Sequence, residues 1–156
     1  MMKAYAKVLY LALSVLLLGA FTTQPMTERQ TQDLLPKSSD PTWDLLARTE
    51  VGYDDNTGLY SAKMPKEVTA LDGQNVTITG FMLPLEASEK FTHFLLSKRT
   101  PTCPFCPPGE PDEIIDVTVM EPVEWAEDAV KVTGTFGLMD DRELGMFFKL
   151  TKAKVQ

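Results

Sequence analysis

Cys103 and Cys106 stand two residues apart in a proline-rich stretch, and they are the only cysteines in the sequence. This stretch, residues 99–112, is called the cysteine loop below, and it also contains five prolines. Proline removes a backbone donor and restricts the residue before it, so the stretch can be neither a helix interior nor a central strand. We therefore predict a stiff loop that presents two thiols. Such a loop costs less entropy to hold in one geometry, which suits a binding site.

Metal binding is the first hypothesis for this pair of thiols. Two thiolates at Cys-x-x-Cys spacing provide half of a tetrahedral zinc site, or a two-coordinate copper(I) site. Zinc needs two further ligands, and His93, the single histidine, is the one imidazole candidate. Nearby carboxylates offer oxygen ligands instead: Glu110, Asp112 and Glu113. One Cys-x-x-Cys pair is a weak signal, and zinc or copper binding through Cys103, Cys106 and His93 therefore competes with two alternatives.

A disulfide between Cys103 and Cys106 is the second hypothesis. Outside the cytosol, two thiols this close are normally oxidised or metal-bound. The ring closed by the bridge is tiny, so the chain-entropy stabilisation is small. In this case the locked loop is a non-catalytic docking surface for a protein partner, formed by Phe105 at its tip together with Pro107 and Pro108.

Thiol–disulfide exchange is the third hypothesis and the one enzymatic candidate. Cys-Pro-Phe-Cys is superficially similar to the redox motif of thioredoxin-like oxidoreductases. Those enzymes place the first cysteine at a helix N-terminus, which lowers its pKa. A helix starting at Cys103 would meet Pro107 and Pro108 at its fifth and sixth residues and could not propagate. We therefore expect a binding protein rather than an enzyme.

The first 22 residues have the pattern of an export signal. Lys3 and Lys7 give a positive start, and an almost wholly apolar run follows over 8–21. That run is short for a bilayer span and suits the apolar region of a cleaved signal peptide. We expect a signal peptide over 1–22, a periplasmic or otherwise exported protein, and membrane attachment only through an uncleaved signal. No cysteine follows the run to carry a lipid anchor.

The rest of the chain divides into two parts. Residues 23–39 are polar and are predicted to be a flexible linker. Residues 40–156 are enough for a single domain. The formal net charge of −7 argues against nucleic acid as a partner, because its phosphates demand a basic face.

Local patterns predict one short helix and about five strands. Asp40 is expected to cap a helix that begins at Pro41 and packs Trp43 on the domain. Gly80 and Gly134 each follow a Val-x-Ile/Val-Thr run, which predicts a sharp bend in the strand. Alternating patterns predict strands over 75–85, 91–97, 113–120, 130–139 and 144–155.

Strongly bent strands are what a small barrel needs at its corners. We therefore predict an all-β fold, a small antiparallel barrel of about five strands similar to the oligonucleotide/oligosaccharide-binding (OB) type, with a short N-terminal helix. A two-sheet sandwich is the alternative. Three connections are also expected: a loop or irregular hairpin over 51–64, an acidic connection over 121–128 and a turn at 140–141.

Four short motifs occur together in this sequence. They are Ala70-Leu71-Asp72-Gly73, Gly80-Phe81-Met82-Leu83-Pro84-Leu85, Cys103-Pro104-Phe105-Cys106-Pro107-Pro108-Gly109 and Leu144-Gly145-Met146-Phe147-Phe148. In combination they resemble a bacterial family, domain of unknown function 3299, from about Trp43 to the C-terminus. The resemblance implies an exported accessory protein without enzymatic activity, linked in some members to zinc-related transport systems of the MacB-like type. The partner it implies is an ABC-type transporter or a metal-binding periplasmic protein.

Overall fold

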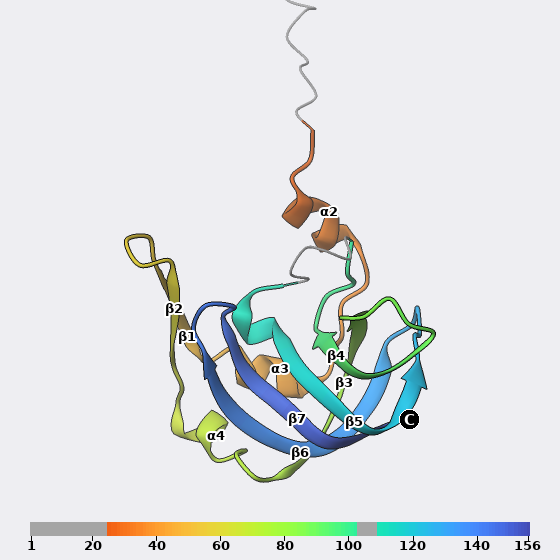
Figure 1. Ribbon diagram of the computed structural model, residues 1–156. Coiled ribbons are helices and arrows are strands. Elements are labelled where there is room, and N and C mark those ends of the chain that lie inside the picture. Colours follow the sequence, from red (N-terminus) through yellow and green to blue (C-terminus); the bar gives the residue numbers. More distant parts are fainter. Residues whose placement is uncertain (1–24, 103–108) are drawn as a thin grey trace, which may run out of the picture.

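Five strands close into a barrel in the computed structural model, which describes residues 25–102 and 109–156 (Figure 1). The strands follow one another around the barrel in the order β3-β4-β5-β7-β6. Their bounds are Asn75–Pro84 for β3, Lys90–Ser97 for β4, Ile114–Glu124 for β5, Val130–Asp141 for β6 and Met146–Val155 for β7. The prediction of a small all-β barrel is confirmed.

One of the five strand pairs is parallel, which corrects the purely antiparallel barrel expected from the sequence. β5 and β7 run in the same direction, and the other four neighbouring pairs are antiparallel. A closed ring with an odd number of strands cannot alternate direction throughout, so one parallel pair is unavoidable. The spatial order β6-β3-β4-β5 is that of a Greek key, and β7 closes it into the five-stranded barrel of the OB type.

Strand β3 changes its partner at Gly80. Residues Asn75–Gly80 pair with β6, whereas Phe81–Pro84 pair with β4. A Cβ atom at Gly80 would lie 2.7 Å from the carbonyl oxygen of Ser97, so no larger residue fits at this corner without a shift of the backbone. The register between β6 and β7 likewise shifts around Gly134. Both glycines therefore stand where the sequence predicted sharp bends.

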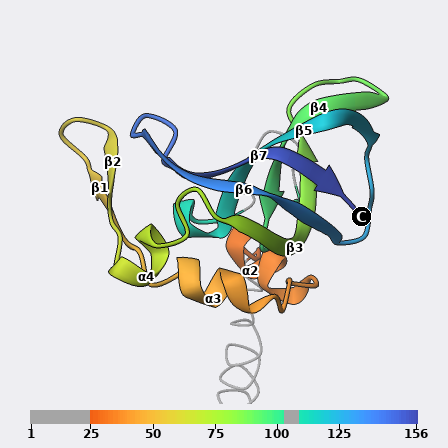
Figure 2. The same ribbon diagram turned by 90° about the horizontal axis from the view of Figure 1, so that it is seen from below.

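The predicted N-terminal helix is present as α3, Pro41–Leu46, and it binds to β3. Asp40 caps it, because its Oδ1 accepts a hydrogen bond from Thr42 N at 3.0 Å. The other carboxylate oxygen of Asp40 accepts from Thr79 N at 2.9 Å, and Trp43 Nε1 donates to Thr79 O at 2.7 Å. Trp43 is fully buried. Figure 2 shows α3 lying alongside β3, where it satisfies the backbone groups of Thr79.

The segment expected to be a flexible linker contains a short polar helix. This helix, α2, spans Glu28–Leu34, and the chain after it binds to the barrel. Lys37 forms a β-bridge with Arg99, and Ser38 N donates to Lys98 O at 2.8 Å. Within the part of the chain that the structure describes, no helix is long and apolar enough to cross a membrane. The signal peptide predicted over 1–22 lies outside that part.

The remaining elements lie at the margin of the barrel. A hairpin of β1 (Glu50–Asp54) and β2 (Leu59–Lys63) stands beside it, followed by the short helix α4 (Lys66–Thr69), and a 3₁₀ turn, η1, spans Pro111–Glu113 (Figures 1 and 2). The hairpin is the second of the two forms expected over 51–64.

Two connections differ from the sequence prediction. β5 continues through Glu124, because Glu124 pairs with Lys90 across the sheet and their side chains form an ion pair at 3.2 Å. The acidic connection is therefore shorter than 121–128. β6 continues through Asp141, and the turn that was expected at 140–141 lies at 142–145, where Gly145 has a φ of +67°.

Candidate functional site

A buried ion pair joins the two ends of the cysteine loop. Arg99 Nε donates a hydrogen bond to Glu113 Oε2 at 2.6 Å, and the two side chains are only 11 % and 10 % exposed. Glu113 Oε2 also accepts from Glu110 N at 3.2 Å. Arg99 lies just after β4, and Glu113 lies just before β5. The pair therefore fixes the first arm of the loop, 99–102, against its second arm, 109–113.

Helix α2 binds to the same ion pair. Arg99 Nη1 donates to Asp33 Oδ1 at 2.6 Å, and Lys37 Nζ donates to the same oxygen at 2.6 Å. These hydrogen bonds, from Lys37 first and Arg99 second, hold the pKa of Asp33 below its ordinary value of 3.8. The hydrogen bond to Glu113 is the main cause that raises the pKa of Arg99. The guanidinium therefore stays charged and holds two carboxylates.

The second arm of the loop carries a negative field. Burial raises the pKa of Asp112 above its ordinary value of 3.8, and the carboxylates of Glu113 and Glu110 raise it further. A raised pKa means that the charged form of the Asp112 carboxyl is less stable in the folded protein than in water. A cation placed beside Asp112 would relieve this cost.

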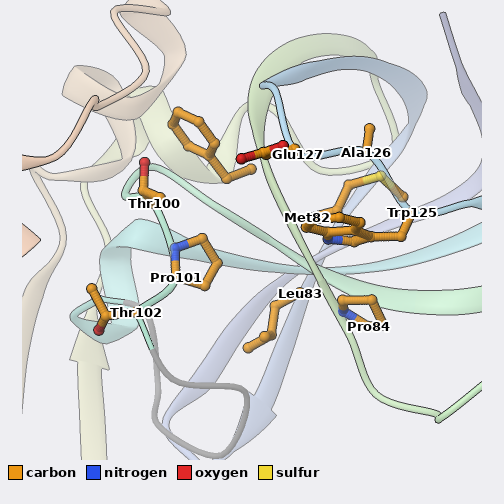
Figure 3. A pocket seen from close by; sticks show the side chains of 10 residues that line it. Met82, Leu83, Pro84, Thr100, Pro101, Thr102, Trp125, Ala126 and Glu127 are labelled. Atoms are coloured by element: carbon orange, nitrogen blue, oxygen red, sulfur yellow. The ribbon is translucent and has the colours of Figure 1, made fainter.

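An apolar groove lies beside the first arm. It has a volume of about 480 Å³ and is lined by residues 81–84 of β3, residues 100–102 of the first arm and residues 125–127 between β5 and β6 (Figure 3). Trp125 is 56 % exposed, which is unusual for so large an aromatic side chain. We call this feature the Trp125 groove.

The floor of the Trp125 groove is one edge of β3. Phe81 and Leu83 line the groove and alternate along β3 with Met82, which also reaches the barrel core. Residues 81–84 pair with β4 on one side. Within the described ranges no strand pairs with their other edge, since β6 has parted from β3 at Gly80. The groove thus combines apolar side chains with a stretch of β3 that pairs with a strand on one edge only among the described residues; Phe81, Met82 and Leu83 are themselves 8 %, 2 % and 7 % exposed.

Most of the residues singled out from the sequence fall outside the described ranges. They are Cys103, Phe105, Cys106, Pro107 and Pro108. Their predicted roles as metal ligands, disulfide partners or docking residues stay predictions. Among the residues that the structure does describe, no group of three or more His, Cys, Asp or Glu side chains is arranged to hold a metal ion.

His93 lies away from the base of the cysteine loop. It is on β4, four residues before Ser97, which corresponds to about 13 Å along a strand. Its Nε2 hydrogen-bonds Asp116 Oδ2 on the neighbouring strand β5 at 2.8 Å. A metal ligand at His93 would therefore have to use the other ring nitrogen, with Asp116 orienting the ring.

Sequence reasoning did not select Arg99 or Trp125 as site residues. The signal for the ion pair was the presence of opposite charges just after one predicted strand and at the start of the next. The signal for the groove was a single tryptophan among acidic residues in a connection. Neither signal identifies its partners, because those are set by how β3, β4 and β5 pair.

The fold and the site define a small barrel of the OB type with an apolar groove beside a constrained loop. The chain belongs to the family DUF3299, described as "Protein of unknown function", whose family model matches residues 31–151. It is similar to a crystal structure of a DUF3299 family protein from Pseudomonas aeruginosa PAO1, with 31% sequence identity and a TM-score of 0.50. The similarity covers 62% of this chain and 66% of that one, slightly less than two thirds of its length. No curated protein matches the sequence.

The raised pKa of Asp112 predicts a pH-dependent stability difference. In the folded state Asp112 holds its proton more tightly than in the unfolded state, so its contribution to stability is present below the unfolded pKa near 3.8 and is lost as the pH rises through the folded pKa. Asp112→Asn cannot ionise. We expect its urea midpoint to exceed that of the natural chain at pH 7, and the difference to shrink as the pH falls toward 3.8. A difference that does not change with pH would contradict this assignment.

Proposed function

We propose that this protein is an exported, non-catalytic binding protein that docks an extended segment of a protein partner in the Trp125 groove. The observation that carries the proposal is an apolar groove whose lining includes residues 81–84 of β3, where no described strand pairs with the edge away from β4. An extended segment can add to such an edge as a further strand, with main-chain hydrogen bonds giving affinity and a side-chain pocket giving specificity.

The lining of the groove defines the chemistry of the docked segment. Trp125 offers a large rigid aromatic surface, and aromatic residues of this kind carry much of the binding energy in protein interfaces. Pro101 and Pro84 add apolar walls, so the segment we propose inserts an aromatic or branched aliphatic side chain. Glu127 at the rim favours a neutral or basic neighbour in that segment. Pro84 has no N–H group, so strand addition ends there.

The cysteine loop extends this docking surface in our proposal. Its first arm lines the groove, and the Arg99–Glu113 pair holds the loop at its base. A Cys103–Cys106 disulfide would stiffen the loop further and present Phe105 to the same partner. With the predicted signal peptide, the partner we propose is an exported or membrane-bound protein, either an ABC-type transporter component or a metal-binding periplasmic protein.

Metal binding through Cys103 and Cys106 is the second candidate function. It is favoured by the negative field at Asp112, because such a field attracts a cation to the loop. Two thiolates satisfy copper(I), whereas zinc needs two more ligands, for which the carboxylates of Glu110, Asp112 and Glu113 are the candidates closest in sequence; His93 lies about 13 Å along β4 from Ser97.

The docking proposal predicts that Trp125→Ala weakens peptide binding. Random peptides displayed on phage would be selected against the natural protein, and the enriched sequences synthesised with a fluorescent label. We expect them to share an aromatic or branched aliphatic anchor and to bind Trp125→Ala at least tenfold more weakly by fluorescence anisotropy. Met120→Ala is the matched control, because Met120 is exposed on β5 and does not line the groove.

Two results would contradict the docking proposal. One is a selection that enriches no peptide with an apolar anchor. The other is a set of peptides whose affinity falls equally in Trp125→Ala and Met120→Ala.

The two proposed roles of the cysteines predict different intact masses for the protein. The exported protein would be purified without reductant or chelator and its intact mass measured under native and denaturing conditions. The docking proposal with a locked loop predicts a metal-free protein that is about two hydrogens lighter than its reduced sequence. A native mass that includes copper or zinc, with two free thiols after denaturation, would overturn the disulfide and support the second candidate.

A further inference from the structure

A second cavity lies against the second arm of the cysteine loop. It has a volume of about 350 Å³, which is within the range of small-molecule sites. Its walls are the β1–β2 hairpin, through Thr49, residues 51–53 and Tyr60, and the second arm of the loop, through residues 110–112. We call this cavity the hairpin pocket.

Two tyrosines form the aromatic wall of the hairpin pocket. The ring centroids of Tyr53 and Tyr60 lie 4.8 Å apart, with the ring planes inclined by 54°. Tyr60 is held in place by its backbone, since its N–H donates to Arg142 O at 2.8 Å. Its ring also packs over Gly145, where an added Cβ would lie 3.0 Å from Tyr60 Cδ2. This wall of the hairpin is therefore anchored on the barrel's turn at 142–145.

Two acidic residues, Glu110 and Asp112, line the pocket from the second arm, and the side chain of Glu110 also accepts a hydrogen bond from the backbone of Glu113 in a capping box. Asp112 is half-buried, and burial together with the charges of Glu113 and Glu110 raises its pKa. This wall is therefore negatively charged and partly shielded from water.

The basic side chains near this wall have other partners. Lys98 Nζ donates to Asp44 Oδ1 at 3.2 Å, and the guanidinium of Arg99 holds Glu113. Arg142 Nε donates to the carbonyl oxygen of Tyr60 at 3.0 Å. None of these three residues lines the pocket; the charge of Lys98 acts on Asp112 from outside it and offsets part of the effect of the neighbouring carboxylates on the pKa of Asp112.

We propose that the hairpin pocket binds a guanidinium or alkylammonium group. A carboxylate forms a charge-assisted hydrogen bond with such a group, and the faces of tyrosine rings attract a cation. Two carboxylates beside two aromatic rings suit an organic cation better than a metal ion, which needs more oxygen ligands. The cation is an arginine or lysine side chain of a partner protein, or a free amine. The proposal does not depend on the Trp125 groove.

The test uses blocked amino acids on the full exported protein. N-acetyl-arginine amide would be titrated into the ¹⁵N-labelled protein and followed by NMR. We expect the amide signals of residues 49–53, 60, 110 and 112 to shift with a millimolar dissociation constant. N-acetyl-citrulline amide, a neutral molecule of nearly the same shape, is expected to bind at least tenfold more weakly. N-acetyl-lysine amide tests the ammonium group.

Variants assign the binding to the pocket. Asp112→Asn is expected to weaken arginine binding at least fivefold, and Tyr53→Leu about threefold, because Tyr53 supplies one of the two rings of the aromatic wall and is 55 % exposed. Glu121→Gln is the matched control for charge. It lies seven residues along β5 from Ile114, roughly 23 Å, and its loss should leave the affinity unchanged.

Two results would overturn the proposal. One is equal affinity for the citrulline and arginine amides. The other is a Glu121→Gln variant that weakens arginine binding as much as Asp112→Asn does. Either result would show diffuse attraction of a cation to an acidic protein. A fourth ligand, the peptide Gly-Ala-Arg-Ala-Gly, identifies the source of the cation. Tighter binding of this peptide than of the blocked amino acid assigns the site to a partner's side chain, and equal binding assigns it to a free cation.

Discussion

The Arg99–Glu113 ion pair is the interaction on which the loop end of the barrel depends. Burying two charges costs several kcal/mol per ion, and the cost is offset only when the geometry is good and further hydrogen bonds are made. Both conditions hold, because the contact is 2.6 Å and Glu113 also accepts from the backbone of Glu110, while Arg99 also holds Asp33. The pair sets the positions of both loop arms. One arm lines the Trp125 groove and the other lines the hairpin pocket.

The closure of the barrel explains why a strand edge is left open. β3 pairs with two neighbouring strands in turn, with β6 up to Gly80 and with β4 after it. The edge left open in the first half is covered by α3, through the bonds of Asp40 and Trp43 to Thr79. The edge left open in the second half has no such cover from a strand among the described residues, and there the groove forms. One change of partner thus places a helix on β3 in one half and leaves an apolar groove in the other.

Local sequence patterns were sufficient for much of the fold. Alternation located the five strands, Asp40-Pro41 located the helix start, and Gly80 and Gly134 marked the bends. These features depend on a residue and its near neighbours. Closing five strands requires a parallel pair, so the strand count already implied one, but not that β5 and β7 form it.

Features that depend on distant residues could not be predicted. The end of β5 at Glu124 is set by its pairing with Lys90, and the polar helix α2 is held by Asp33 bonding to Arg99. The two sites also depend on strand register, since their walls come from segments far apart in the chain. The predicted roles of Cys103 and Cys106 fall outside the described residues and stay predictions.

The central claim is that Arg99 and Glu113 act together to hold the loop base, and a double-mutant cycle tests it most directly. Arg99→Met, Glu113→Gln and the double variant would be unfolded in urea at pH 7. Each single change leaves a buried partner unpaired and should cost about 3 kcal/mol of unfolding free energy. The double variant should cost less than the sum of the two, with a coupling above about 1 kcal/mol. Costs that add to within about 0.5 kcal/mol would contradict the claim.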